Sequence, residues 1–163
     1  MSTSAAVVVE LGPDDWAELR EIRLRALADA PDAFSVVHSD VVVLDEDVWR
    51  DRLATTNPTY VVREAGSTVA MAGGFAPPDS PAAFVWGMWT APEARGRGHS
   101  SALLDRVVTW ARAVGRTPHL HVTEGNDAAR RLYVRRGFEP TGTWEPLREG
   151  SPKRVEELVL SRG

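Results

Sequence analysis

The 163-residue chain contains no cysteine, and this absence removes several kinds of chemistry at once. Disulfide bonds, thiolate zinc sites and cysteine nucleophiles are all excluded. The chain has only four histidines, and none of them follows the His-Glu-x-x-His spacing of zinc enzymes. The sequence therefore predicts no metal site.

Long apolar runs are also missing, as is a basic N-terminal region followed by one. A membrane-spanning helix needs about 20 apolar residues, and a secretory signal has a basic stretch before its apolar core. The net charge of −4 argues against a general nucleic-acid binder. We expect a cytoplasmic protein without membrane or nucleic-acid partners, folded as a single domain over residues 1–163.

One segment, Arg-Gly-Arg-Gly-His-Ser-Ser at 95–101, lies between a strand-like run at 83–90 and a helical run at 101–114. Its glycines allow a sharp turn and close approach to a ligand. The helix that follows begins with free N–H groups and the positive end of its dipole. Together they form a candidate anion site. An ordinary glycine-containing turn before a helix explains the same residues equally well.

Two established phosphate motifs fit this segment poorly. A Walker loop requires a lysine, which is absent here. The dinucleotide motif Gly-x-Gly-x-x-Gly is approached by Gly96, Gly98 and Ser101. That motif, however, normally opens a domain of several strand–helix units, and here it lies past the middle of the chain.

Apolar periodicity predicts elements in the order β α α β β β α β α β β. We expect a helix between the breaks at 12–15 and 30–32. Residues 34–44 are ambiguous, since their valines favour extended structure or a loop with a short turn. This order predicts an α/β (α+β) fold, with one mixed, mostly antiparallel sheet of six to seven strands and about four helices. The expected strands are 5–11, 59–64, 68–75, 83–90, 119–123, 138–144 and 155–160, and the other helices are 45–54, 101–114 and 126–136.

Two motifs carry a resemblance to a known family. The stretch MWTAPEARGRGHSSALL resembles the Arg/Gln-x-x-Gly-x-Gly/Ala signature of GCN5-related N-acetyltransferases, the GNAT superfamily. About thirty residues later, NDAARRLYVRRGF resembles the family's second motif, Asn-x-x-Ala-x-x-Leu-Tyr-x-x-x-Gly-Phe. Ser100 stands where glycine or alanine is usual, and its small side chain should fit. The resemblance implies the GNAT fold and an acetyltransferase activity.

The same resemblance implies acetyl-CoA as co-substrate and no metal. Its pyrophosphate is expected on the N–H groups of 95–101, and its pantetheine arm along the strand edge at 88–90. The implied cofactor-binding residues are Met88, Trp89, Thr90, Arg95, Gly96, Arg97, Gly98, His99, Ser100, Ser101, Asn126 and Ala129.

The chemistry would be direct attack of an amine on the thioester within a ternary complex, because no cysteine is present for an acyl-enzyme route. An alkylamine with a pKa near 10 needs a base. His121 is the first candidate and stands where some members carry a glutamate; Glu124 is the second. His119 shares a strand face with His121 and stays an alternative. Each also has a purely structural explanation.

The resemblance implies that the Tyr133 hydroxyl points at the thioester sulfur of acetyl-CoA. A phenol with a pKa near 10 is a weaker acid than a thiol near 8.5. Tyr133 is therefore expected to donate a hydrogen bond to the developing thiolate rather than to transfer its proton fully. A core tyrosine at helical spacing is the alternative. A main-chain N–H at Trp89 or Thr90 is expected to stabilise the oxyanion.

For the acceptor, the sequence offers candidates without identifying a substrate. Phe34, His38, Trp86 and Trp144 are the expected substrate-binding residues, with Trp49 a further exposed candidate. Asp40 or Asp45 would attract a cationic amine. Three hypotheses stay open: a small-molecule amine acetyltransferase, a protein N-terminal or lysine acetyltransferase, and a non-catalytic CoA-binding regulatory module. A homodimer through the terminal strands is a further expectation.

Overall fold

A single seven-stranded sheet forms the centre of the computed structural model, which describes residues 5–161. The strand order is β1-β2-β3-β4-β5-β7-β6. Only β4 and β5 pair in parallel, and the other neighbours are antiparallel. The predicted mixed, mostly antiparallel sheet is confirmed. The strands are β1 Val7–Glu10, β2 Thr59–Glu64, β3 Ser67–Phe75, β4 Ala82–Thr90, β5 Thr117–Thr123, β6 Glu139–Pro146 and β7 Arg154–Val159.

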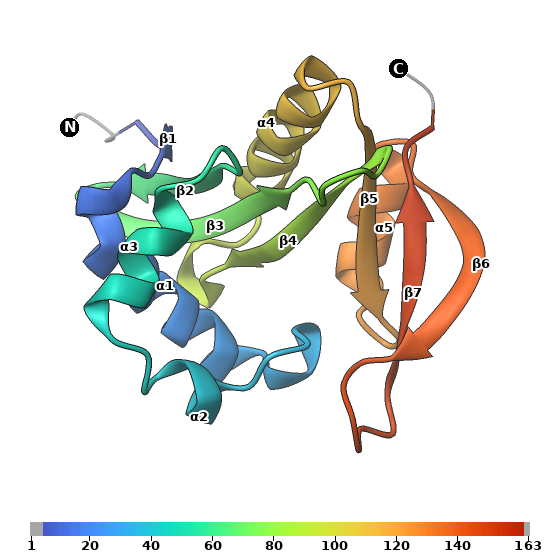
Figure 1. Ribbon diagram of the computed structural model, residues 1–163, viewed down its shortest axis with the longest axis horizontal. Helices are drawn as coiled ribbons and strands as arrows, with labels where there is room; N and C mark the ends of the chain where they lie inside the picture. Colours follow the sequence, from blue (N-terminus) through green and yellow to red (C-terminus); the bar gives the residue numbers. More distant parts are fainter. Residues whose placement is uncertain (1–4, 162–163) are drawn as a thin grey trace.

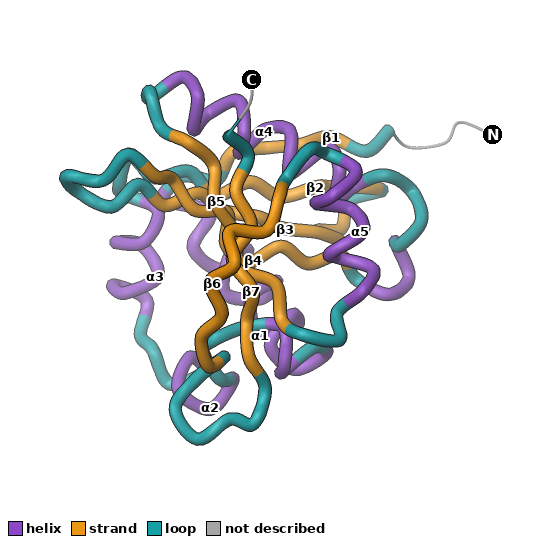
Figure 2. Tube along the Cα trace, turned by 90° about the vertical axis from the view of Figure 1, so that its right-hand side faces the viewer, coloured by secondary structure: helices purple, strands orange, loops and turns teal. Residues whose placement is uncertain are grey.

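Helices cover both faces of this sheet (Figures 1 and 2). The helices are α1 Trp16–Asp29, α2 His38–Val41 and α3 Glu46–Leu53 on one face, and α4 His99–Ala113 and α5 Asp127–Arg135 on the other. The described residues thus form five α-helices, against about four predicted. The additional one is α2, a single turn inside the segment that was expected to be extended or a loop with a short turn. Burial of Val41 anchors this turn.

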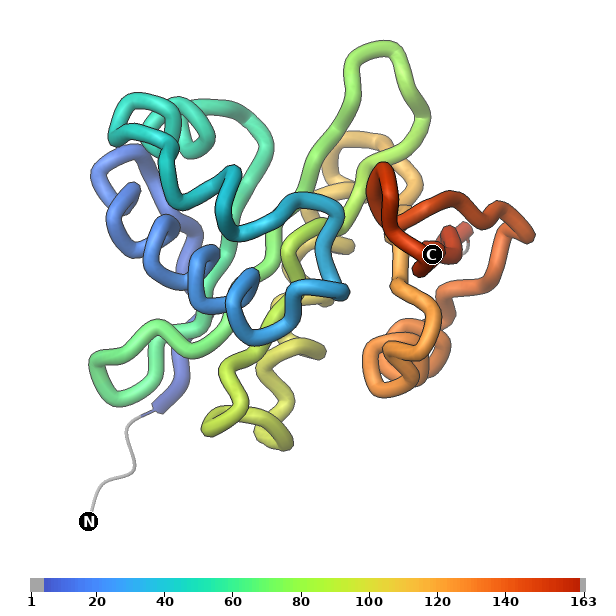
Figure 3. The backbone as a smooth tube through the Cα atoms, turned by 90° about the horizontal axis from the view of Figure 1, so that it is seen from below, coloured from blue at the N-terminus to red at the C-terminus, as the bar shows by residue number. Residues whose placement is uncertain are grey.

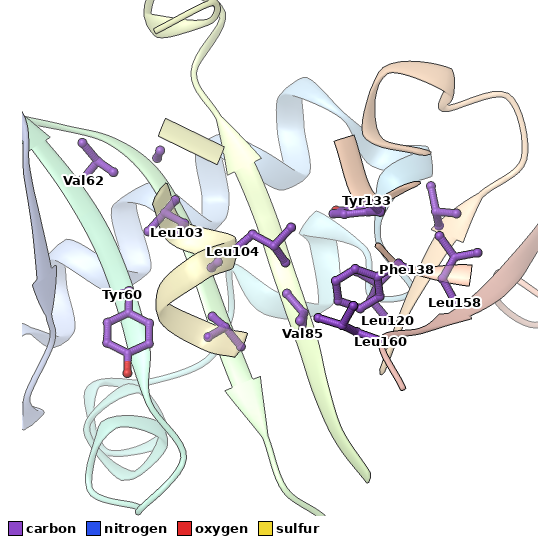
Figure 4. Packing of buried hydrophobic residues seen from close by; sticks show 14 of the residues in the cluster. Tyr60, Val62, Val85, Leu103, Leu104, Leu120, Tyr133, Phe138, Leu158 and Leu160 are labelled. Atoms are coloured by element: carbon purple, nitrogen blue, oxygen red, sulfur yellow. The ribbon is translucent and has the colours of Figure 1, made fainter. Parts of the chain in front are cut away.

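Apolar stripes explain how the helices dock. Helix α4 buries Leu103, Leu104 and Val107 against the sheet, as the spacing predicts. The same core continues under α5, where Phe138 packs beside Tyr133 and is surrounded by leucines of the last strands (Figure 4). Tyr133 is therefore held by the core rather than by a mobile loop.

The opposite core is formed by α1 and α3. Helix α1 buries Leu19, Ile22 and Leu27, and α3 contributes Trp49 and Leu53. Trp49 has no exposed surface. The expectation that it is an exposed acceptor-site residue was wrong, because its helical spacing with Leu53 turns the ring into the core.

Helix α1 is also fixed to the sheet by a polar cluster. The Glu18 carboxylate accepts hydrogen bonds from the Arg63 guanidinium at 2.6 and 3.0 Å and from the Thr68 hydroxyl. The hydrogen bond from Arg63 is the main reason that the pKa of Glu18 lies below its ordinary value. These contacts fix the position of α1 over β2 and β3.

Strands β4 and β5 separate soon after they meet. Their register pairs Ala82–Phe84 of β4 with residues 117–119 and extends no further. On its other edge, β4 places Trp89 opposite Met71 and Trp86 opposite Gly73, so that β4 carries one residue more than β3 between these pairs. Gly87, with a φ of 67°, lies in this bulge. A wedge therefore opens between the carboxyl ends of β4 and β5 (Figure 1).

Candidate active site

The wedge between β4 and β5 opens into a cavity of about 980 Å³, and residues of both strands form its inner wall. Six regions line it: the end of α1 with the turn that follows, β4, the start of α4, β5, the start of α5, and the loop between β6 and β7. The volume is in the range of small-molecule and cofactor sites. Cavities commonly form where a sheet splits in this way, because neither strand has a partner at the open edge.

All but one of the predicted cofactor-binding residues line this cavity. The exception is Arg97, whose guanidinium pairs with the Glu64 carboxylate and donates to the Glu93 carbonyl. Arg97 points away from the cavity because this carboxylate on β2 attracts it. The lining residues are Met88, Trp89, Thr90, Arg95, Gly96, Gly98, His99, Ser100, Ser101, Asn126 and Ala129.

Residues 95–101, hereafter the phosphate cradle, have the geometry of an anion site. Gly96 and Gly98 both have a φ of 81°, and Gly98 is the N-cap of α4 without a side-chain cap. Among the described residues, none accepts a hydrogen bond from the N–H groups of 96–101. No atom lies within 4 Å of a Cβ built at either glycine. A diphosphate fits this arrangement, since its oxygens would satisfy N–H groups at the positive end of the helix dipole.

Side chains around the cradle have mainly structural partners. The buried His99 ring lies 3.1 Å from Glu64, and the Ser100 hydroxyl lies 2.8 Å from the Thr90 hydroxyl. Arg95 pairs with Asp29 at 2.9 Å and donates to the Thr90 carbonyl at 3.0 Å. Arg95 therefore joins the end of α1 to the end of β4. The cradle's capacity for anions comes chiefly from its main chain.

The free edge of β4 supplies further main-chain groups. The N–H of Ala91 donates to Val69, and Trp89 lies opposite Met71, so both residues direct their N–H groups toward β3. Alternate residues of a strand direct their main-chain groups to opposite edges. Of the two expected oxyanion donors, the register therefore favours Thr90 over Trp89.

Tyr133 reaches the same cavity from α5. It is 6% exposed, and its ring centroid lies 6.1 Å from that of Phe138 (Figure 4). Burial raises its pKa, so the phenol stays protonated at neutral pH. Within residues 5–161 the hydroxyl has no hydrogen-bond partner. Tyr133 is thus a neutral hydrogen-bond donor available to a group in the cavity.

The two candidate bases on β5 and after it differ in their surroundings. His121 lines the cavity, stacks on Phe84 with ring centroids 5.7 Å apart, and lies 3.4 Å from Glu145. Glu124 also lines the cavity, but it accepts the N–H of Arg154 at 2.9 Å and pairs with the same residue's guanidinium. These contacts occupy Glu124, and they favour His121.

The alternative base, His119, lies apart from the cavity. Its Nδ1 is buried without a hydrogen bond, 3.7 Å from the Glu157 carboxylate. His119 is tilted against Phe84, the same ring on which His121 stacks. The shared strand face is as expected, yet only His121 extends to the cavity lining.

Asn126, at the start of α5, caps this helix. Its side-chain oxygen accepts the N–H of Ala129 at 3.4 Å. This bond leaves the side-chain NH₂ as the group available to a ligand. The expected role of Asn126 in cofactor binding is compatible with this orientation, because the amide groups of a pantetheine arm offer carbonyl acceptors.

The predicted acceptor-site residues divide into two pairs. Phe34 and Trp86 line the cavity, whereas His38 on α2 and Trp144 on β6 do not. Trp144 is 42% exposed and lies under the Arg154 guanidinium. Asp40 and Asp45 are also outside the lining, and Asp45 serves as the N-cap of α3. The expected attraction of a cationic amine by these two acids therefore finds no support in their positions.

Sequence reasoning missed three basic residues at the acceptor end. Arg148, in the loop between β6 and β7, donates to the carbonyls of Pro31 and Phe34, the latter at 2.9 Å. Lys153 in the same loop pairs with Asp32 at 3.1 Å. Arg148 and Lys153 thus connect this loop to the turn after α1. The two segments face each other in Figure 3. The third is Arg23 on α1. Its charge lies within the apolar stripe of that helix, and this position was the one signal in the sequence that could have identified it.

Two possible features are not found among the described residues. No group of three or more His, Cys, Asp or Glu side chains is placed to hold a metal ion. No helix there is both long and apolar enough to cross a membrane.

Comparisons with known proteins agree with this geometry. No curated protein sequence matches the chain. Among solved structures, a GNAT-family acetyltransferase from Streptococcus pneumoniae is similar, with 22% identity over 95% of this chain and 98% of that one, and a TM-score of 0.77. The acetyltransferase yncA from Salmonella typhimurium, solved with its cofactor acetyl-CoA, has 20% identity over 96% and 93% of the two chains and a TM-score of 0.76.

A third similar structure is the ribosomal-protein-alanine N-acetyltransferase from Brucella melitensis. It has 20% identity over 94% of this chain and 98% of that one, and a TM-score of 0.74. At these identities the structures show a shared fold. The sequence profile of the acetyltransferase (GNAT) family matches residues 16–138, well over half of the chain. The chain therefore belongs to the GNAT acetyltransferase family, and it is an acyltransferase that uses acetyl-CoA.

Proposed function

We propose that this enzyme transfers the acetyl group to a primary amine of a small molecule, by direct attack within a ternary complex. The observation that carries the proposal is one continuous cavity with unpaired N–H groups at one end and an aromatic-lined space at the other. Both substrates can then be bound together. The bridge from Arg148 and Lys153 to the turn after α1 encloses the acceptor end, which favours a compact amine over a long polypeptide.

Donor binding falls to the phosphate cradle and the free edge of β4. Acetyl-CoA supplies the activated acetyl group. The cradle holds the diphosphate, while the main-chain groups of Met88 and the N–H of Thr90 bind the arm in the manner of an added strand. The Thr90 carbonyl already accepts a hydrogen bond from Arg95. A free N–H at this edge also stabilises negative charge as it develops on the carbonyl oxygen.

Two residues assist the reaction, one at the attacking amine and one at the departing sulfur. His121 accepts a proton from the attacking amine, directly or through one water, because imidazole is a suitable base near neutral pH. The neighbouring Glu145 stabilises the imidazolium that results. Tyr133 donates a hydrogen bond to the departing sulfur, and its raised pKa keeps the proton in place until charge has developed.

Thiol release from acetyl-CoA tests the function directly. We expect turnover with one or more compact primary amines in a panel of amines, amino acids and short peptides. Turnover confined to peptides would instead identify a protein acetyltransferase, and CoA binding without any turnover would identify a regulatory module.

The phosphate cradle is tested by a matched pair of glycine substitutions at the two ends of α4. Gly98 and Gly115 have φ values of 81° and 76°, and neither has an atom within 4 Å of a built Cβ. Replacing either with valine introduces similar backbone strain. We expect Gly98→Val to weaken CoA binding by at least about 100-fold, since one diphosphate makes several charge-assisted bonds, and Gly115→Val to leave it intact.

Calorimetry with CoA measures both affinities, and melting curves confirm that both variants are folded. Equal losses in the two variants would show that backbone strain, and not the cradle, controls binding.

For Tyr133, the substitution Tyr133→Phe removes the hydroxyl and preserves the ring that packs on Phe138. We expect kcat to fall by roughly 10- to 1,000-fold with little change in CoA affinity, because the lost bond forms mainly as charge develops on sulfur. Steady-state kinetics and calorimetry separate these quantities. An unchanged kcat would exclude Tyr133 from the reaction.

For the base, His121→Asn and His119→Asn form a second matched pair on one strand. We expect His121→Asn to lower kcat/KM by roughly 100-fold or more. His119→Asn should retain the wild-type kcat/KM, since His119 does not line the cavity. An unchanged kcat/KM in His121→Asn would assign the base elsewhere.

A further inference from the structure

Arg23 is a buried positive charge at the acceptor end of the cavity, and no negative charge is paired with it among residues 5–161. The residue is 7% exposed, and it lines the cavity from the sheet-facing side of α1. Its Nε and Nη1 atoms are buried without a hydrogen-bond partner. Within residues 5–161 no carboxylate pairs with it. A buried charge without a partner is costly, and proteins normally pair such a group.

The immediate neighbours of the Arg23 guanidinium are aromatic. It lies 4.8 Å from the ring centroid of Phe34 and 5.4 Å from that of Trp86. These two rings, both in the cavity lining, fix its orientation through cation–π contacts. Such contacts hold a cation in place but leave its N–H donors unused.

The guanidinium is also close to the free edge of β4. A Cβ built at Gly87 would lie 3.5 Å from Nη1 of Arg23. Gly87 lies in the part of β4 beyond Phe84 that no longer pairs with β5, one residue before Met88. An anion bound to Arg23 would therefore lie beside the place where the thioester is expected.

No nearby acid is available to neutralise Arg23. Of the acids that line the cavity, Asp29 pairs with Arg95, Asp32 with Lys153 and Glu124 with Arg154, while Glu145 lies beside His121. None of these four carboxylates pairs with Arg23. The charge that acts on Arg23 is that of a second cation, Arg52, which lies over the Trp49 ring. Burial, together with Arg52, lowers the pKa of Arg23 to about 10, so it stays charged at neutral pH.

We propose that the amine acceptor carries a carboxylate, as an amino acid does, and that Arg23 binds this group. This inference rests on the proposed function. The planar guanidinium matches a carboxylate with two parallel hydrogen bonds. The carboxylate supplies the missing negative charge, and its position beside Gly87 leaves the adjacent amine directed at the thioester. The pyrophosphate of CoA is not this anion, because its cradle lies at the start of α4.

The experiment compares Arg23→Met with the wild type on paired acceptors, the L-amino acids and their carboxamides. Methionine keeps a long side chain among the rings and removes the charge, so the variant should fold at least as well as the wild type. For the wild type we expect kcat/KM to be higher for a free amino acid than for its amide. In Arg23→Met we expect KM for that amino acid to rise by roughly 10- to 100-fold, as for a lost charged hydrogen bond.

Arg52→Met is the matched control, since it removes the neighbouring charge without touching the cavity lining. It should leave the preference for the carboxylate intact. Equal rates on amino acids and amides, or an unchanged KM in Arg23→Met, would overturn the proposal. If the wild type acetylates only amines without a carboxylate, the assignment of Arg23 fails while the proposed acetyl transfer stands.

A readout that does not depend on turnover separates the two proposals further. Melting curves of the CoA-bound protein with and without the amino acids report binding directly. Amino acids should raise the melting temperature of the wild type and of Arg52→Met, but not that of Arg23→Met. If the wild type binds them in this way and acetylates no amine, Arg23 is an anion-binding residue and the proposed function is wrong. Absence of any rise in the wild type counts against Arg23.

Discussion

The end of hydrogen bonding between β4 and β5 after Phe84 is the constraint on which the rest of the site depends. Had the two strands continued to pair, their edges would have been satisfied by each other and no cavity would separate them. Their separation exposes main-chain groups of β4 and brings His121 on β5 and Tyr133 on α5 to one space. The split is possible because β4 and β5 are joined by a long connection through α4 rather than by a tight turn, and because only three residues of each strand pair.

Charge is distributed unevenly along this cavity. The cradle contributes helix-terminal N–H groups at one end, and Arg23 contributes a buried guanidinium at the other. Three of the four acids in the lining pair with arginine or lysine, and the fourth, Glu145, lies beside His121. An unliganded site of this kind attracts anions rather than cations at both ends. From the sequence we expected a negative charge at the acceptor end, from Asp40 or Asp45, to attract a cationic amine. The unpaired charge found there is instead the positive charge of Arg23.

Local motifs made part of this site predictable from sequence. The segments 95–101 and 126–138 are each local in sequence, and their glycines and caps act within a few residues. The start of α4, helix α5 and the Asn126 cap are therefore confirmed, while anion binding by the cradle stays a prediction. The acceptor end depends on contacts between residues far apart in the chain. Aromatic identity could not separate Trp86, in the lining, from Trp49, in the core, because only the docking of α3 decides which ring is covered.

Arg23 shows why periodicity alone could not identify the acceptor site. Its spacing places it on the buried face of α1 together with Ile22 and Leu27, and a helical pattern does not record whether that face meets a sheet or a cavity. The difference arises at Gly87, whose positive φ permits the β4 bulge and which lies beside Nη1 of Arg23, 3.5 Å from a Cβ built on the glycine. One glycine thus lies between the two halves of the site: it shapes the strand edge expected to bind the thioester and is next to the cation expected to bind the acceptor. A side chain at this position would be strained by the positive φ, and its Cβ would press on Met71 at 3.2 Å.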